Sequence, residues 1–254
     1  MKASYFEFRF RVWIMAVLIT LGFWSPWIEY APDWLHLGTR ATAWLWLGFE
    51  LGSLGLTPAG GIVVATASII GVAALAVWVR VWGTAYLGNN TVQNADMKAG
   101  AVLSDGPYRY VRNPLYIGTF LTIGSICVLM PLSGAVVTVV LLTIFLFRLI
   151  LGEEAFLAPR LGEPYAAYRK AVPRLVPSLR PRVAAGGRKP QWGSAVLGEI
   201  LPIGVLVSFA ALSWQYDSHL LMRAVLVCFG ISLVTRALVS KPSLESDPSQ
   251  AGAV

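Results

Sequence analysis

The segment from Asn89 to Tyr116 is the most polar and turn-rich stretch in the first half of this 254-residue chain, and it leads directly into an apolar run. Proline suits the first turn of a helix, because its missing N–H would be unpaired there in any case. Pro114 therefore marks a helix start, with Asn113 as the expected N-cap. This loop should bring hydrogen-bonding groups such as Tyr108 to the start of an apolar helix.

A second polar segment follows the same apolar run. Residues 114–147 carry no charge, and they are followed by Arg148, Glu153 and Glu154. Pro131 and its small neighbours break the run near its middle, which predicts a hairpin of two helices, each of about 17 residues or roughly 25 Å. The hairpin would return the second polar segment to the first. A polar pocket over an apolar chamber suits a polar cofactor and a lipophilic acceptor.

Composition excludes several classes of protein. Apolar residues make up 56% of the chain and charged residues 13%, with a net charge of +7, whereas soluble domains are about 25% charged. A lone soluble domain and a disordered chain are therefore both excluded. Cys127 and Cys228 lie in apolar runs, and the only histidines are His36 and His219. We expect no metal site, no Ser-His-Asp triad and, without a GxGxxG motif, no Rossmann core.

The elements that must position these residues are membrane helices, since a span needs about 20 apolar residues. We expect an all-α, polytopic integral membrane bundle with about six spans. The segment 39–56 contains Glu50, and we expect it to form a short re-entrant or interfacial helix. The six predicted spans are 12–27, 59–79, the two halves of 114–147, 195–214 and 220–239.

The charge distribution predicts an orientation. From Glu153 to Lys189 there are eight Lys and Arg residues against three acidic ones, and positively charged loops stay in the cytoplasm. The N-terminus, residues 83–113, residues 152–190 and the C-terminus are therefore expected to be cytoplasmic. A basic run beside a membrane favours contact with anionic lipid over contact with nucleic acid.

Residues 85–178 contain a series of short motifs in a fixed order. They are Gln93, Gly106-Pro107-Tyr108, Arg112-Asn113-Pro114-Leu115-Tyr116-Ile117-Gly118, Glu153-Glu154 and Gly162-Glu163-Pro164-Tyr165 with Tyr168 and Val172-Pro173. Taken in this order, the motifs resemble those of the isoprenylcysteine carboxyl methyltransferase family, which belongs with the phospholipid methyltransferases.

The resemblance implies a bacterial-type membrane methyltransferase that binds S-adenosylmethionine, faces the cytoplasm from the bacterial inner membrane and uses a lipophilic or lipid acceptor. The catalytic residues would be Arg148 and Glu153, and the substrate would contact Arg148 and Arg112. The residues implied to line the cofactor are Gln93, Gly100, Ala101, Val102, Leu103, Tyr108, Asn113, Pro114, Leu115, Tyr116 and Glu153.

Asn113 stands where the family pattern has histidine, so a scheme that needs a group titrating near neutral pH at that position does not apply. A cationic Arg148 favours an anionic acceptor such as an isoprenylcysteine carboxylate. The alternatives are a phospholipid-amine N-methyltransferase, an NADPH-dependent enzyme similar to steroid reductases, and a non-enzymatic lipid-binding protein. We expect three regions: N-terminal membrane helices (1–82), a methyltransferase core (83–190) and an additional C-terminal helix pair (191–254).

Overall fold

The computed structural model describes residues 2–24, 41–93 and 102–239, and in these parts of the chain it is helical, with no strand. The helices, in chain order, are α1 (Tyr5–Arg9), α2 (Arg11–Phe23), α3 (Ala43–Ser53), α4 (Pro58–Leu87), α5 (Asn89–Gln93), η3 (Gly106–Arg109), α6 (Pro114–Cys127), α7 (Leu132–Ala171), α8 (Trp192–Gly198), α9 (Ile200–Leu212), η4 (Ser213–Gln215) and α10 (Ser218–Val239).

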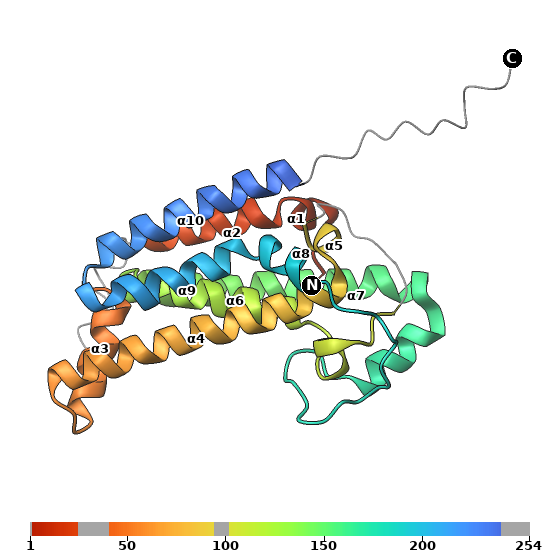
Figure 1. The fold of residues 1–254 in the computed structure, drawn as a ribbon, viewed down its shortest axis with the longest axis horizontal. Coiled ribbons are helices and arrows are strands. Elements are labelled where there is room, and N and C mark those ends of the chain that lie inside the picture. Colours follow the sequence, from red (N-terminus) through yellow and green to blue (C-terminus); the bar gives the residue numbers. More distant parts are fainter. Residues whose placement is uncertain (1, 25–40, 94–101, 240–254) are drawn as a thin grey trace, which may run out of the picture.

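The long helices lie side by side in an elongated bundle (Figure 1). At one end, which we call the loop end, lie α1, α5, η3, α8 and the last part of α7. The opposite end, called the far end, carries α3 and the start of α10. In the described ranges, α2, α4, α6, α7, α9 and α10 run between these two ends. This arrangement confirms an all-α membrane bundle.

Three of these helices are long and apolar enough to cross a membrane, namely α4, α7 and the first 18 residues of α10. The bent pair of α8 and α9 together with η4 provides a fourth candidate. Helices α2 and α6 are apolar but short, and the 14 residues of α6 measure about 21 Å. Exposed apolar side chains on the outer faces, such as Ile144 and Val227, suit a hydrocarbon environment better than water.

The predicted hairpin forms, but its two arms are unequal. The break falls between Cys127 and Leu132, as expected, and Pro131 is the N-cap residue of α7. Helix α7 then continues for 40 residues, through Glu153 and Glu154, to Ala171. The second polar segment is therefore largely the last part of this helix. Its direction changes at Gly162, whose φ of 59° is a conformation that favours glycine.

Two features of the predicted spans differ from expectation. The segment 195–214 is not one straight helix, because α8 and α9 meet at a 71° bend, and Glu199 lies at the break. Helix α4 continues past the expected region boundary at residue 82 to Leu87. The 39–56 segment contains α3, whose 11 residues are too short for a span.

Two apolar clusters hold the bundle together. One joins α1, α2, α6 and α7 around Leu142 and Leu149. The other joins α3, α4, α6, α9 and α10 around Trp44 and Phe209. The indole N–H of Trp44 donates to Thr66 Oγ1 at 3.0 Å, which satisfies its polar group inside the bundle. Because α6 belongs to both clusters, its two faces are fixed independently.

Candidate active site

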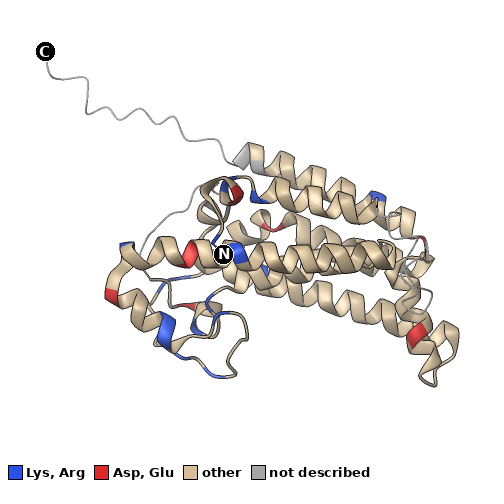
Figure 2. Ribbon diagram, turned by 180° about the vertical axis from the view of Figure 1, so that it is seen from behind, with Lys and Arg blue, Asp and Glu red and all other residues tan. Residues whose placement is uncertain are grey.

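A cavity of about 1030 Å³ opens within the bundle and continues to the loop end. Helix α6 lines it from Pro114 to Ile126. Apolar side chains of α2 form one wall, and those of α9 and α10 form another. Polar side chains gather where the cavity reaches the loops, and Figure 2 shows that the charged residues concentrate at this end of the molecule. The cavity thus combines a polar mouth with an apolar interior.

Tyr116 and Glu153 meet inside this cavity. Tyr116 lies in the first turn of α6 and Glu153 lies on α7, and the tyrosine hydroxyl donates to Glu153 Oε2 at 2.9 Å. Arg11 of α2 also lines the cavity and is near enough for its charge to act on both groups. The structure therefore brings together a carboxylate, a phenol and a guanidinium that are far apart in the sequence.

Tyr108 lines the same cavity and has a buried hydroxyl that is unsatisfied within the described structure. It lies in η3 and is 7% exposed. Its Oη atom has no hydrogen-bond partner among the described residues, whereas its backbone carbonyl accepts from Tyr168 Oη at 2.9 Å. Burial, followed by the nearby charge of Glu153, raises the pKa of Tyr108 well above its ordinary value. The phenol therefore stays protonated and can donate to a ligand.

Glu154 has a different role from its neighbour. It is 4% exposed and accepts a bidentate contact from Arg174, at 3.2 and 2.8 Å. Arg112 approaches its Oε1 atom at 3.1 Å and also donates to the Arg169 carbonyl at 2.8 Å. This carboxylate ties the loop before α6 to the segment after α7. Arg112 lines the cavity, but part of its guanidinium is already engaged in that tie.

Asn113 occupies the N-cap position of α6, as predicted, but its side chain does not cap the helix. Instead, its Nδ2 atom donates to the carbonyl of Arg174 at 3.1 Å. The expectation of a side-chain cap was therefore wrong: Asn113 Oδ1 accepts no hydrogen bond from the first turn, and the contact of Nδ2 with Arg174 sets the orientation of the amide. Pro114 does lie at the start of the helix, where its missing N–H costs nothing.

Arg148 lies outside the residues that line the cavity. Its guanidinium forms a bidentate ion pair with Glu7 of α1, with Nη2 at 2.9 Å from both carboxylate oxygens. Ser4 and Glu7 form a capping box that fixes the start of α1 and hence this carboxylate. The expectation that Arg148 faces the same chamber as the start of α6 does not hold in this structure.

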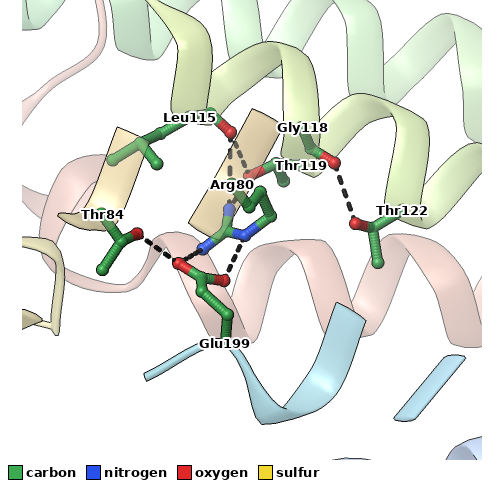
Figure 3. Close-up of polar contacts among 7 residues, drawn as sticks. All are labelled: Arg80, Thr84, Leu115, Gly118, Thr119, Thr122 and Glu199. Carbon is green, nitrogen blue, oxygen red and sulfur yellow. Dashed lines mark hydrogen bonds and ion pairs between the residues drawn. The ribbon is translucent and has the colours of Figure 1, made fainter. Parts of the chain in front are cut away.

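A second ion pair, which sequence reasoning missed, does lie on the cavity wall. Arg80 of α4 and Glu199 of the α8–α9 break meet at 2.5 and 2.9 Å, and both line the cavity (Figure 3). The available signal was the presence of each charge in or beside a predicted span, since ionisable residues within membrane segments are expensive and commonly functional.

Most of the predicted cofactor residues that the structure describes converge on the cavity. Those on its lining are Val102, Leu103, Tyr108, Asn113, Pro114, Leu115, Tyr116 and Glu153, together with Arg112 from the predicted substrate site. Gly100, Ala101 and the side chain of Gln93 lie outside the described residues. In the described ranges, no group of three or more His, Cys, Asp or Glu side chains is placed to hold a metal ion.

Comparisons with known proteins find similarity in the central part of the chain. Residues 64–163 match the family model described as phospholipid methyltransferase. A stretch of 79 residues is 34% identical to the protein-S-isoprenylcysteine O-methyltransferase of Schizosaccharomyces pombe (strain 972 / ATCC 24843). That stretch covers 31% of this chain and 34% of the relative, so the match spans about a third of the relative's length. No solved structure matches the chain.

Proposed function

We propose that this chain, whose residues 64–163 match the phospholipid methyltransferase family model, transfers a methyl group from S-adenosylmethionine to a lipophilic acceptor. The observation that carries the proposal is a single cavity with a polar mouth, formed by Tyr108, Tyr116 and Glu153, and an apolar interior. A polar donor and an apolar acceptor could meet only where both environments are continuous.

The residues at the polar mouth fit a cofactor with both donor and acceptor groups. Tyr108 offers a buried hydroxyl that lacks a partner among the described residues, which is costly unless a ligand satisfies it. Glu153 offers a carboxylate for cationic or N–H groups, and Tyr116 holds that carboxylate in place. We infer that these three side chains, with the backbone of Val102 and Leu103, would hold S-adenosylmethionine.

When bound, S-adenosylmethionine supplies an electrophilic methyl group on a sulfonium. Transfer forms a bond from the acceptor to the methyl carbon while the methyl–sulfur bond breaks, and sulfur keeps the electron pair. An acceptor that is already a carboxylate needs no general base, so the protein acts by orienting the acceptor and excluding water. The absence of a titrating group at Asn113 is compatible with such an acceptor.

We propose an anionic acceptor of the isoprenylcysteine carboxylate type. The S. pombe relative bears the name of such an enzyme, and arginines 9, 11, 112 and 188 line the cavity near its polar mouth. An apolar chain attached to the carboxylate would lie between α2 and α10. A phospholipid amine is the competing acceptor, because the matched family model carries that name.

Direct binding and transfer measurements test this proposal. Purified protein in detergent should bind S-adenosylhomocysteine and not NADPH. It should transfer tritium from labelled S-adenosylmethionine to N-acetyl-S-farnesylcysteine, and the product should release volatile methanol in base, as a methyl ester does. Base-stable label in phosphatidylethanolamine vesicles would replace the carboxylate with an amine acceptor, and binding of NADPH alone would overturn the methyltransferase assignment.

Two variants test the cofactor site. Glu153→Gln should weaken S-adenosylhomocysteine binding by about ten-fold or more, because a lost hydrogen bond to a charged group is worth about 1.5–3 kcal/mol. Glu154→Gln is the neighbouring comparison, and it should lower thermal stability because Glu154 holds Arg112 and Arg174. Unchanged affinity in a folded Glu153→Gln variant would remove Glu153 from the site.

We propose that Arg148 holds the acceptor, which requires it to exchange its present partner. Its guanidinium must leave Glu7 to reach an acceptor. If it does so, Arg148→Ala should lower turnover with S-adenosylhomocysteine affinity within about two-fold, and Arg148→Lys should rescue poorly because an ammonium cannot make a bidentate contact. Full turnover in Arg148→Ala would mean that Arg148 only attaches α1 to α7 through Glu7.

A further inference from the structure

The C-terminal helices form part of the cavity, although they lie outside the residues that match the family model. Leu201 and Pro202 of α9 and Met222, Val225 and Phe229 of α10 line it. The matched region ends at residue 163. One wall of the chamber that would hold the acceptor is therefore supplied by a part of the chain beyond the family core.

Glu199 is the polar link between these helices and that core. It lies at the 71° break between α8 and α9 and is 1% exposed. Its Oε2 atom accepts from Arg80 Nε at 2.5 Å, and its Oε1 atom accepts from Arg80 Nη2 at 2.9 Å and from Thr84 Oγ1 at 2.5 Å. Both oxygens of the carboxylate thus accept hydrogen bonds from α4 (Figure 3).

The other side of the Arg80 guanidinium reaches α6. Its Nη1 atom donates to Thr119 Oγ1 at 2.5 Å and lies 3.4 Å from the carbonyl oxygen of Leu115. Gly118 leaves room for this arrangement, because a Cβ atom there would overlap Arg80 Cγ. Arg80 therefore joins three elements, since it lies on α4, bonds the first turns of α6 and is held by the start of α9.

Stability alone does not explain such a pair. Desolvation of two buried charges offsets most of their attraction, and replacing both partners with apolar residues of similar size is often neutral or stabilising. Charged residues inside membrane helices are also rare unless they have a function. The pair lines the cavity and bonds the turns of α6 around Tyr116, so the geometry favours a role in the site.

We propose that Glu199 and Arg80 are positioning residues for the acceptor side of the methyl-transfer site. Glu199 fixes the guanidinium of Arg80, and Arg80 fixes residues 115–119 of α6 against α4 and α9. Loss of the pair would let the first turns of α6 and the α9 wall move relative to each other. This inference rests on the proposed methyltransferase function and assigns a positioning role to the break between α8 and α9.

The decisive variant removes both charges, Arg80→Met with Glu199→Met. A merely structural pair would leave activity intact once the fold is intact. For a positioning pair we expect a melting midpoint close to that of the wild type, S-adenosylhomocysteine affinity within about three-fold, and kcat/KM for N-acetyl-S-farnesylcysteine lowered at least ten-fold. A folded double variant with kcat/KM within two-fold of the wild type overturns the proposal.

A smaller variant keeps the test valid if the double variant does not fold. Thr119→Val preserves shape and the ion pair but removes the acceptor of one Arg80 hydrogen bond, and kcat/KM should fall about five-fold. Thr143→Val on α7 is the matched control, since it makes the same change at a hydroxyl that bonds the Val139 carbonyl one turn away and does not line the cavity, and it should stay within two-fold. Equal activities of the two threonine variants contradict the inference.

The outcomes also separate this inference from the function on which it rests. If the wild type binds no S-adenosylhomocysteine and methylates neither N-acetyl-S-farnesylcysteine nor phosphatidylethanolamine, the proposed function fails and the inference fails with it. If the wild type is active and the double and Thr119→Val variants match it, only the positioning role fails.

Discussion

At the scale of single residues, the adjacent glutamates 153 and 154 have different roles in the site. Glu153 and Glu154 are about 100° apart around α7, and although both line the cavity, their carboxylates have different partners. Glu153 faces the cavity and accepts from Tyr116, whereas Glu154 is surrounded by Arg112, Arg169 and Arg174. One carboxylate is therefore available to a ligand, and the other holds the loops that shape the pocket.

Tyr108 gives a prediction in which affinity and stability change in opposite directions. Its hydroxyl is buried without a partner in the described structure, so Tyr108→Phe should leave the melting midpoint unchanged or raise it. The same change should weaken S-adenosylhomocysteine binding about five-fold, because the ligand loses a donor. Calorimetric titration and thermal unfolding of one preparation measure both quantities.

Tyr110→Phe is the control for that experiment. Tyr110 is two residues away, packs against Trp82 and does not line the cavity, so its variant should bind like the wild type. Weaker binding in both variants, or a lower melting midpoint in Tyr108→Phe, would mean that the phenols act through the fold and not through the ligand.

At the scale of elements, close helix contacts depend on glycines that face a neighbouring backbone. Helices α3 and α4 approach so closely that a Cβ at Gly61 would fall against Gly48 O and 2.5 Å from Gly52 N. Small residues permit this approach in membrane helices. Because backbone atoms cannot move out of the way as a side chain can, the helices themselves would have to separate.

Gly61→Ala should therefore destabilise the protein, since overpacking costs about 1–3 kcal/mol. That corresponds to a fall of a few degrees in the melting midpoint. Gly71→Ala on the same helix has open space around its Cβ and should leave the midpoint unchanged or slightly higher. Thermal unfolding of both variants in one detergent makes the comparison, and equal midpoints would contradict the close α3–α4 contact.

The attachment of α1 to α7 should depend on pH. The hydrogen bond from Arg148 and the capping contact with Ser4 lower the pKa of Glu7 from 4.5 to about 2. A lowered pKa in the folded state means that the stabilisation is complete above about pH 4.5 and is lost as pH falls toward 2. The pair is partly exposed, so solvent screens it and its contribution to stability is small.

Glu7→Gln should thus have a slightly lower melting midpoint than the wild type at pH 6. The difference should shrink steadily as the pH falls below about 4.5, because the wild type then loses the same charge. Thermal unfolding of both proteins at several pH values between 3 and 6 provides the test. A difference that grows on acidification would contradict the lowered pKa.

At the scale of the whole molecule, the bundle gathers its chemistry at one end. Helices α1, α5 and α8, the η3 turn and the end of α7 lie together at the loop end, where most charged residues also lie (Figures 1 and 2). The co-location of these segments agrees with the expectation that residues 83–113 and 152–190 share a side. That this side is cytoplasmic stays a prediction from the positive charge of the loops.

Cysteine labelling in intact cells tests the orientation. In a background without Cys127 and Cys228, a cysteine at position 98 should be protected from an impermeant reagent, and Gln215→Cys should react. Gln215 is preferable to Asp217, whose carboxylate accepts from the N–H groups of His219 and Leu220 and caps α10. Labelling at position 98 with protection at 215 would reverse the assigned topology.

The sequence predicted the parts of the fold that depend on local pattern. Long uncharged runs defined the membrane helices, and Pro131 marked the hairpin break. It did not predict that α7 would continue to Ala171, because polar residues after a span are as compatible with a helix as with a loop. It also did not predict the bend at Glu199 or the contact of that residue with Arg80, which lies 119 residues away.

By itself, the sequence determined that this is an apolar helical membrane protein, and the order of its motifs pointed to the methyltransferases that its central part matches. Hydropathy and motif spacing are properties of neighbouring residues, so they can be read without a structure. Only the tertiary structure decided which charges face the cavity. It directed Arg148 to Glu7, brought Arg80 to Glu199 and left Tyr108 without a partner in the described residues. These outcomes depend on which helix faces meet, and that is fixed by the packing of the whole bundle.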